Sequence, residues 1–159
     1  MNKVSEYQAK AIREGLLGKN KTIATAESVT SGLLQYAFST IPDASKFFQG
    51  GLTAFNLAQK AKHLNVEPIH AQEVNCVSIK VAKEMAMHCC ELFLSNWGLG
   101  ITGYASPVPE SDNKCFAYFA IAFEGKIMVS GCLEPKNTEP IKIQEEYVLA
   151  MLSELQKLL

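Results

Sequence analysis

The chain has 159 residues, of which 48% are hydrophobic and 19% are charged, and its formal net charge is -1. This length suits one domain with a real hydrophobic core, and the composition excludes a disordered chain. The small net charge offers no electrostatic attraction to nucleic acid or to an anionic membrane, and no apolar run approaches the ~20 residues of a membrane span.

The N-terminal segment and the cysteines indicate the compartment. The N-terminus forms an amphipathic pattern that contains Glu6 and Glu14, which is not typical of a signal peptide. The five cysteines include no C-x-x-C pair, so we expect them to be reduced and mostly buried. The three histidines show no metal-ligand spacing with these cysteines, so no metal site is predicted. These features favour a cytoplasmic protein.

The first half of the chain alternates predicted helices and strands. Apolar residues recur at helical spacing over 2–17, and a short β-branched and apolar strand follows over 22–26. Helices are predicted over 30–40 and 57–64. Between these two helices, a strand over 47–55 contains Gly50-Gly51, a pair that suggests a bulge or a close backbone approach.

The second half ends in a hairpin and a helix. A loop is predicted over 68–72, and Ser78 is the expected N-cap of a long helix over 79–95. The remaining predicted elements are a strand over 97–102, a loop over 103–113, strands over 114–123 and 126–133, and a helix over 141–158. The order predicts an α/β fold over residues 1–159, as a three-layer α/β/α domain with a mixed sheet. Loops that follow its parallel strands should form a ligand cleft.

The stretch Thr22 to Leu34, TIATAESVTSGLL, carries the strongest functional signal. A strand pattern gives way to a small polar turn that ends at Gly32, and an apolar helical pattern follows. This order brings backbone N–H groups and the hydroxyls of Ser28, Thr30 and Ser31 to one place. The positive end of the following helix would favour a developing anion there.

Ser28 and Lys60 are the candidate reacting pair. A serine nucleophile needs a base, and a lysine can serve if burial lowers its pKa. The charge of neighbouring Lys62 would lower the pKa of Lys60 further, although two lysines on a helix more often form a solvated face. From spacing alone, a turn or cap role is the commoner one for a serine in the position of Ser28. Glu27 could bind backbone N–H groups or act as an acid–base group. Thr102 could contact a substrate oxygen or only cap its loop.

Four segments, in order, resemble the CinA C-terminal domain family, which includes the nicotinamide mononucleotide deamidases. TIATAESVTSG is similar to T-x-x-T-A-E-S-C-T-G-G, and FFQGGLTAFNLAQKAKHLNV is similar to F-x-x-G-x-x-x-Y-S-N-x-x-K-x-x-x-L-G-V. NCVSIKVAKEMA is similar to G-A-V-S-x-x-V-x-x-x-M-A, and GLGITGYASP resembles T-G-I-A-G-P. The resemblance covers nearly the whole chain.

The resemblance implies an amidohydrolase that converts a nicotinamide-nucleotide carboxamide to the acid and ammonia, without a metal or another cofactor. The family's serine and lysine fall on Ser28 and Lys60. Ser28 would attack the amide carbon, Lys60 would take the proton, and N–H groups between Thr30 and Gly32 would hold the oxyanion. The substrate-binding positions expected are Glu27, Thr30, Ser31, Gly32, Phe55, Thr102, Gly103 and Lys136. The family also suggests a homodimer with a small-molecule nucleotide as its ligand.

Several positions depart from the family pattern. Ser31 replaces the first of two glycines and would narrow the oxyanion pocket, and Phe55 replaces a tyrosine and lacks its hydroxyl. Phe55 could line the pocket or fill the core. The family's F-x-G-D-R, whose arginine would bind a nucleotide phosphate, is replaced by CLEPKNTEP, in which Lys136 is the nearest cation. The alternative is therefore a degenerate domain that binds a nucleotide or a protein partner without turnover.

Overall fold

The computed structural model describes residues 4–159 and contains a five-stranded mixed sheet in the order β2-β1-β3-β4-β5. The strands are β1 (Ile23–Glu27), β2 (Phe48–Thr53), β3 (Trp97–Tyr104), β4 (Phe116–Phe123) and β5 (Lys126–Leu133). β1 pairs in parallel with β2 and β3, whereas β4 runs antiparallel to both β3 and β5. The predicted mixed sheet and the late hairpin are therefore confirmed.

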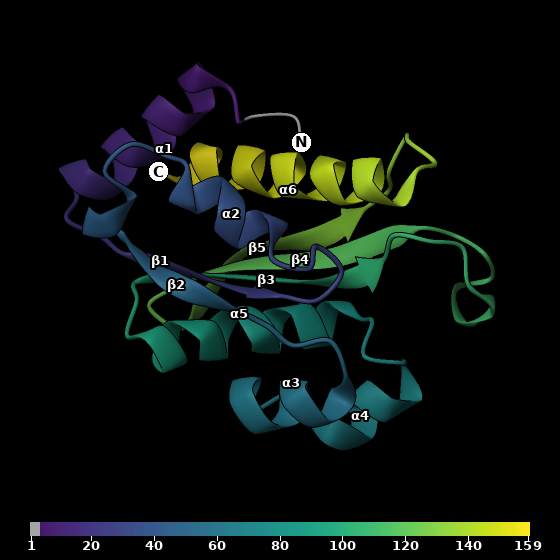
Figure 1. Ribbon diagram of the computed structural model, residues 1–159. Helices are drawn as coiled ribbons and strands as arrows, with labels where there is room; N and C mark the ends of the chain where they lie inside the picture. The colour runs from purple at the N-terminus through teal and green to yellow at the C-terminus, as the bar shows by residue number, and fades with distance from the viewer. Residues whose placement is uncertain (1–3) are drawn as a thin grey trace.

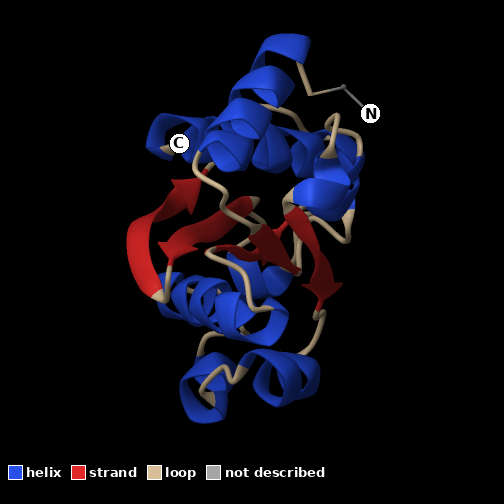
Figure 2. Cartoon of the chain, turned by 90° about the vertical axis from the view of Figure 1, so that its left-hand side faces the viewer, coloured by secondary structure: helices blue, strands red, loops and turns tan. Residues whose placement is uncertain are grey.

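Helices cover both faces of this sheet (Figures 1 and 2). One face carries α1 (Glu6–Gly18), α2 (Leu33–Ser39) and α6 (Pro140–Leu158), and the other carries α3 (Leu57–Leu64), α4 (Pro68–Glu73) and α5 (Ile79–Phe93). This arrangement confirms the predicted three-layer α/β/α fold. Within residues 4–159, no helix has both the length and the apolar character needed to cross a membrane.

The prediction of a loop over 68–72 is wrong, because this segment forms the helix α4. The carboxylate of Glu67 accepts hydrogen bonds from the backbone N–H groups of Ile69 and His70. Pro68 occupies the first helical position, where its missing N–H costs nothing. An effective N-cap and a favourable proline therefore start a short helix where the composition indicated a turn.

The helix predicted over 30–40 begins later than expected, at Leu33. Ser31 and Gly32 adopt left-handed backbone angles, with φ of 51° and 97°, so neither residue can belong to a right-handed helix. The turn after β1 is consequently longer than predicted. Residues 2–3 of the first predicted helix lie outside the described residues.

The glycine pair in β2 fulfils both expectations drawn from it. Ile23 pairs with Phe48, but the next residue of β1 pairs with Gly50, so one residue of β2 bulges out of the ladder. A Cβ atom added to Gly51 would come within 2.2 Å of the Thr25 hydroxyl oxygen. The pair therefore provides a bulge and a close backbone approach beside β1.

The path of the chain places a cleft at the end of β1. The chain passes from β1 through α2 to β2, then returns through α3, α4 and α5 to β3 on the other side of β1. The two connections use opposite faces of the sheet, as Figure 1 shows. Ligands of open α/β sheets bind where such connections diverge, beyond the carboxyl ends of the strands. The first residue beyond β1 is Ser28.

Candidate active site

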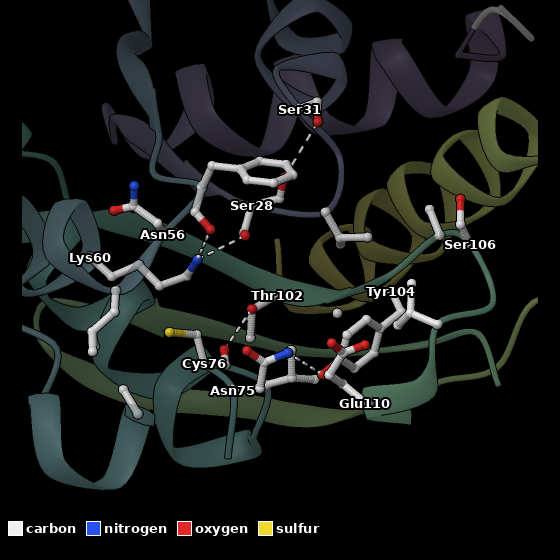
Figure 3. Close-up of a pocket in the computed structure, with 18 of the residues that line it drawn as sticks. Ser28, Ser31, Asn56, Lys60, Asn75, Cys76, Thr102, Tyr104, Ser106 and Glu110 are labelled. Atoms are coloured by element: carbon white, nitrogen blue, oxygen red, sulfur yellow. Dashed lines mark hydrogen bonds between the residues drawn. The ribbon is translucent and has the colours of Figure 1, made fainter. Parts of the chain in front are cut away.

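Ser28 and Lys60 meet at the carboxyl end of β1. Ser28 directly follows the strand, and its backbone N–H donates to the carbonyl of Ile101 in β3 at 3.1 Å. Lys60 lies on the buried side of α3, and Leu64, one helical turn further along, lies on the same side. Its Nζ atom is 2.9 Å from Ser28 Oγ (Figure 3), so the expected contact between the two side chains is present.

The amine of Lys60 is held in a buried position. The residue is only 1% exposed, and Nζ also donates to the carbonyls of Ala54 at 2.8 Å and Phe55 at 3.0 Å. Burial lowers the pKa of Lys60 to about 8, against a smaller opposing effect from Cys76. The main cause of the lowered pKa is thus desolvation, rather than the charge of Lys62 considered from the sequence.

This geometry suits proton transfer between Lys60 and Ser28. A charged ammonium has three N–H groups, which match the three oxygen acceptors around Nζ. When the amine is neutral, two N–H groups can remain on the backbone carbonyls of Ala54 and Phe55. The nitrogen lone pair then faces Ser28 Oγ and can accept its proton. The two carbonyls therefore orient Lys60 as a base for Ser28.

The carboxylate of Glu27 holds the turn after β1 by hydrogen bonds. Glu27 is fully buried and accepts hydrogen bonds from the Thr30 hydroxyl at 2.6 Å and from three backbone N–H groups, those of Gly32, Leu34 and Gln35, at 2.8–3.0 Å. These donors belong to the turn and to the first turn of α2. The sequence left two roles open for Glu27, and its contacts are those of a turn carboxylate that binds N–H groups.

The turn after Ser28 leaves one backbone N–H group beside the cavity for a substrate oxygen, that of Val29. The N–H of Ser31 donates to the Ser28 carbonyl, and the N–H of Gly32 donates to Glu27. Of the predicted oxyanion donors, only the Thr30 N–H has no hydrogen bond within the described residues, but Thr30 is fully buried and does not line the cavity. The backbone N–H of Val29, directly after Ser28, also makes no hydrogen bond within the described residues, and Val29 does line the cavity. Val29 N–H is therefore the donor that this turn offers to an oxyanion.

A cavity of about 640 Å³ opens beside the Ser28–Lys60 pair. The predicted site residues that line it are Ser28, Ser31, Phe55, Lys60, Thr102 and Gly103. The predicted residues outside its wall are Glu27, Thr30, Gly32 and Lys136. Lys136 is exposed in the segment between β5 and α6, where its backbone N–H donates to Glu146 at 2.7 Å. The structure therefore does not bring the expected phosphate-binding cation into the cavity.

The structure shows the surroundings of Phe55 and Thr102, two residues of the cavity wall for which the sequence left two roles open. Phe55 is 74% exposed and lies at the rim of the cavity, so it does not fill the core. Thr102 is 1% exposed, and its hydroxyl donates to the carbonyl of Cys76 at 2.8 Å (Figure 3). Thr102 thereby fixes the turn between α4 and α5 against β3.

Several wall residues were missed by the sequence reasoning, including Asn75, Tyr104, Glu110 and Gln144. Asn75 Nδ2 donates to the Tyr104 hydroxyl at 3.0 Å, and Gln144 Nε2 donates to the carbonyl of Val29 at 2.7 Å. These residues come from distant segments without a local motif, so no pattern in the sequence indicated them. In residues 4–159, no group of three or more His, Cys, Asp or Glu side chains is placed to hold a metal ion.

The fold and the site together define an α/β domain with a candidate serine–lysine site at the end of its first strand. The model of the CinA C-terminal domain matches residues 5–159, and the chain belongs to this family.

Relatives of known sequence and structure are consistent with this assignment. A "putative competence-damage inducible protein" of Moorella thermoacetica is 36% identical over 131 residues, which are 81% of this chain and 32% of that protein. A "CinA-like protein" of Prochlorococcus marinus is 41% identical over 101 residues, 63% of this chain and 24% of that protein. The chain thus spans about a third or less of the length of these relatives.

Solved structures share the fold. A CinA superfamily protein of Escherichia coli superposes with a TM-score of 0.89 at 26% identity, covering 99% of this chain and 94% of that one. A CinA superfamily protein of Klebsiella pneumoniae has the same TM-score at 22% identity, covering 95% and 94% of the two chains, and this second likeness concerns the fold alone.

Proposed function

We propose that this chain is an amidohydrolase that hydrolyses the carboxamide of a nicotinamide-nucleotide type of substrate to the acid and ammonia. One observation carries the proposal: the buried amine of Lys60 lies 2.9 Å from the Ser28 hydroxyl, in the wall of a cavity. A pKa of about 8 leaves part of the Lys60 population neutral near physiological pH, as a general base requires. Membership of the CinA C-terminal domain family supports the reaction class.

The proposed reaction proceeds in two stages. The Lys60 amine takes the proton of Ser28, and Oγ attacks the amide carbon to form a tetrahedral intermediate. The oxyanion faces the N–H group of Val29. Lys60 then returns the proton to the nitrogen of the leaving group, so the C–N bond breaks and ammonia departs. Water attacks the acyl-enzyme with Lys60 again as base, and the acid leaves with Ser28 restored.

A second candidate function is binding without turnover, of a nucleotide or a protein partner. The exposed ring of Phe55 at the rim of the cavity favours it, because an unpartnered aromatic side chain beside a pocket is a common contact for a ligand or a protein. Ser31 also lines the cavity, at a position where the family pattern has a glycine, and its side chain would narrow the space for an oxyanion.

Ammonia release from nicotinamide mononucleotide and from nicotinamide riboside tests the proposal. The wild-type protein should turn over at least one of them, and Ser28→Ala should lower kcat by at least about a thousandfold. Ser39→Ala is the matched control, because that exposed hydroxyl donates only to the Tyr36 carbonyl at the end of α2. Absence of turnover on both compounds would favour the binding function.

Two further expectations stay predictions. We propose that the protein is a homodimer, which light scattering after size-exclusion chromatography would measure. We also propose that residues 1–159 behave as one domain, so that thermal unfolding should give a single cooperative transition by two independent probes.

A further inference from the structure

The cavity wall is poor in positive charge. Of the described residues that line it, only Lys60 and Glu110 are ionisable as a base or a carboxylate. The Nζ atom of Lys60 already has three oxygen acceptors, so its ammonium has no N–H group left for a phosphate. Glu110 lies across the cavity from Lys60 (Figure 3), on the short 3-10 turn Pro109–Ser111. A phosphate dianion in this space would meet a carboxylate and no free cation.

The cations nearest in sequence to the expected phosphate site do not reach the cavity. Lys136 is exposed outside the wall, and Lys142 places its amine 3.4 Å from the carboxylate of Glu145. The single arginine, Arg13, donates through Nε to Asp43 at 2.8 Å, and neither residue lines the cavity. The bidentate fork that binds phosphate well is therefore committed elsewhere.

The N-terminus of α6 also lines the cavity, through Pro140 and Gln144, and a helix N-terminus often binds anions. Here the first helical residue is Pro140, which has no N–H group. Glu139 occupies the N-cap and places its own negative charge at the positive end of the helix. The amide of Gln144 is used by the Val29 carbonyl. This helix start is therefore a weak site for a second anion.

Neutral polar groups are plentiful in the same wall. Asn56, Gln72, Asn75, Tyr104 and Ser106 carry amides and hydroxyls. Asn75 Nδ2 already donates to the Tyr104 hydroxyl and Asn56 Oδ1 already accepts from the Gln59 N–H, which leaves the Asn56 NH₂, the Tyr104 O–H and the groups of Gln72 and Ser106 for a ligand. Such groups match the hydroxyls of a ribose, which are neutral donors and acceptors. The carboxylate of Glu110 would favour the positive charge that a pyridinium ring carries once its nitrogen is bound to ribose. The polar wall thus matches a nucleoside cation better than a nucleotide.

We propose that the cavity takes a phosphate-free, N-ribosylated pyridinium carboxamide, the chemical class of nicotinamide riboside, in preference to its 5′-phosphate. The inference rests on the proposed amidohydrolase function and names the substrate class of that same site. Glu110 is its specificity-determining residue, because it supplies the charge that attracts the pyridinium cation and repels a phosphate.

Steady-state ammonia release from the riboside and from the mononucleotide tests this inference. We expect kcat/KM to be at least about tenfold higher for the riboside than for the mononucleotide. Added salt should lower this riboside-to-mononucleotide ratio, because it screens the repulsion between Glu110 and the phosphate. Glu110→Gln should lower the ratio at least about threefold, and Glu110→Lys should lower it further by improving the mononucleotide. Glu73→Gln, which removes an exposed carboxyl of α4 outside the wall, should leave the ratio unchanged.

The outcomes separate the two proposals. If the mononucleotide is turned over as well as the riboside, or if the Glu110 variants leave the ratio of the two kcat/KM values unchanged, the substrate preference is overturned and the amidohydrolase function still holds. If neither compound is hydrolysed, the amidohydrolase fails, and titration calorimetry decides the preference. Tighter binding of the riboside, weakened by Glu110→Gln, would support it, whereas equal binding or no binding of the two compounds would overturn it.

Discussion

The Lys60 amine contacts the Ser28 hydroxyl across 32 positions of sequence, and it also donates to the backbone carbonyls of Ala54 and Phe55. Those carbonyls belong to the segment that leaves β2 for α3. The chain that follows β2 therefore supplies both the base and the acceptors that orient it.

The activity should depend on the protonation of Lys60. Because the proposed base must be neutral, kcat/KM should rise with pH and level off above an inflection near 8, the pKa to which burial lowers the amine. Initial rates of ammonia release between about pH 6 and about pH 9 would measure the profile. A flat profile, or one that falls through this range, would remove Lys60 from the role of base.

Lys60 should also make the stability depend on pH. Its folded pKa of about 8 lies below the ordinary value of 10.5, so between these values the unfolded chain binds more protons than the folded one. The free energy of unfolding of the wild type should therefore rise by up to about 3 kcal/mol as the pH rises through this window. Lys60→Met should abolish this contribution, as urea titrations at both ends of the window would show.

Lys62→Met is the matched control for that experiment, because Lys62 is an exposed lysine two positions along the same helix. It should retain the pH dependence of the wild type. An identical dependence in both variants would mean that the amine of Lys60 is not desolvated in solution.

Glu27→Gln should destabilise the turn that carries Ser28. The carboxylate oxygens of Glu27 accept from the Thr30 hydroxyl and from backbone N–H groups of Gly32, Leu34 and Gln35, so an amide NH₂ would face donors. We expect a loss of about 2 kcal/mol in the free energy of unfolding, together with lower activity at temperatures where the variant is folded. Chemical denaturation would measure the loss in the free energy of unfolding.

The exposed carboxyl of Glu73 provides the comparison for Glu27. Glu73→Gln should leave the stability within about 0.5 kcal/mol of the wild type, because surface substitutions usually do. Equal stabilities for the two variants would contradict a structural role for the buried carboxylate.

Gly100→Ala should separate β3 from α5. An added Cβ atom would come within 2.4 Å of the Ala82 carbonyl oxygen and 2.6 Å of the Ala86 nitrogen, both backbone atoms of α5. The overpacking should cost about 1–3 kcal/mol, seen as a lower melting temperature. Gly18→Ala, at the end of α1 with open space around it, should instead be neutral or slightly stabilising. Similar melting temperatures for both variants would contradict this close packing.

Local patterns predicted the elements well and their ends less well. The strand before Ser28 and the long helix capped by Ser78 follow from periodicity and capping, which involve neighbouring residues only. The helix at Pro68–Glu73 was missed because proline and polar residues are common to turns and to helix starts. The start of α2 was misplaced because Ser31 and Gly32 both adopt left-handed angles, and the Gly32 N–H is held by the buried carboxylate of Glu27, which the local pattern does not indicate.

By itself, the sequence determined the order of strands and helices, the polar turn that carries Ser28, and the membership of the CinA C-terminal domain family. Only the tertiary structure decided that Lys60 is buried against that serine, that Glu27 supports the turn instead of facing the cavity, and that Lys136 lies outside it. The physical reason is that periodicity and capping are properties of adjacent residues. Burial, and with it the lowered pKa of Lys60, arises only when separate layers of the fold come together.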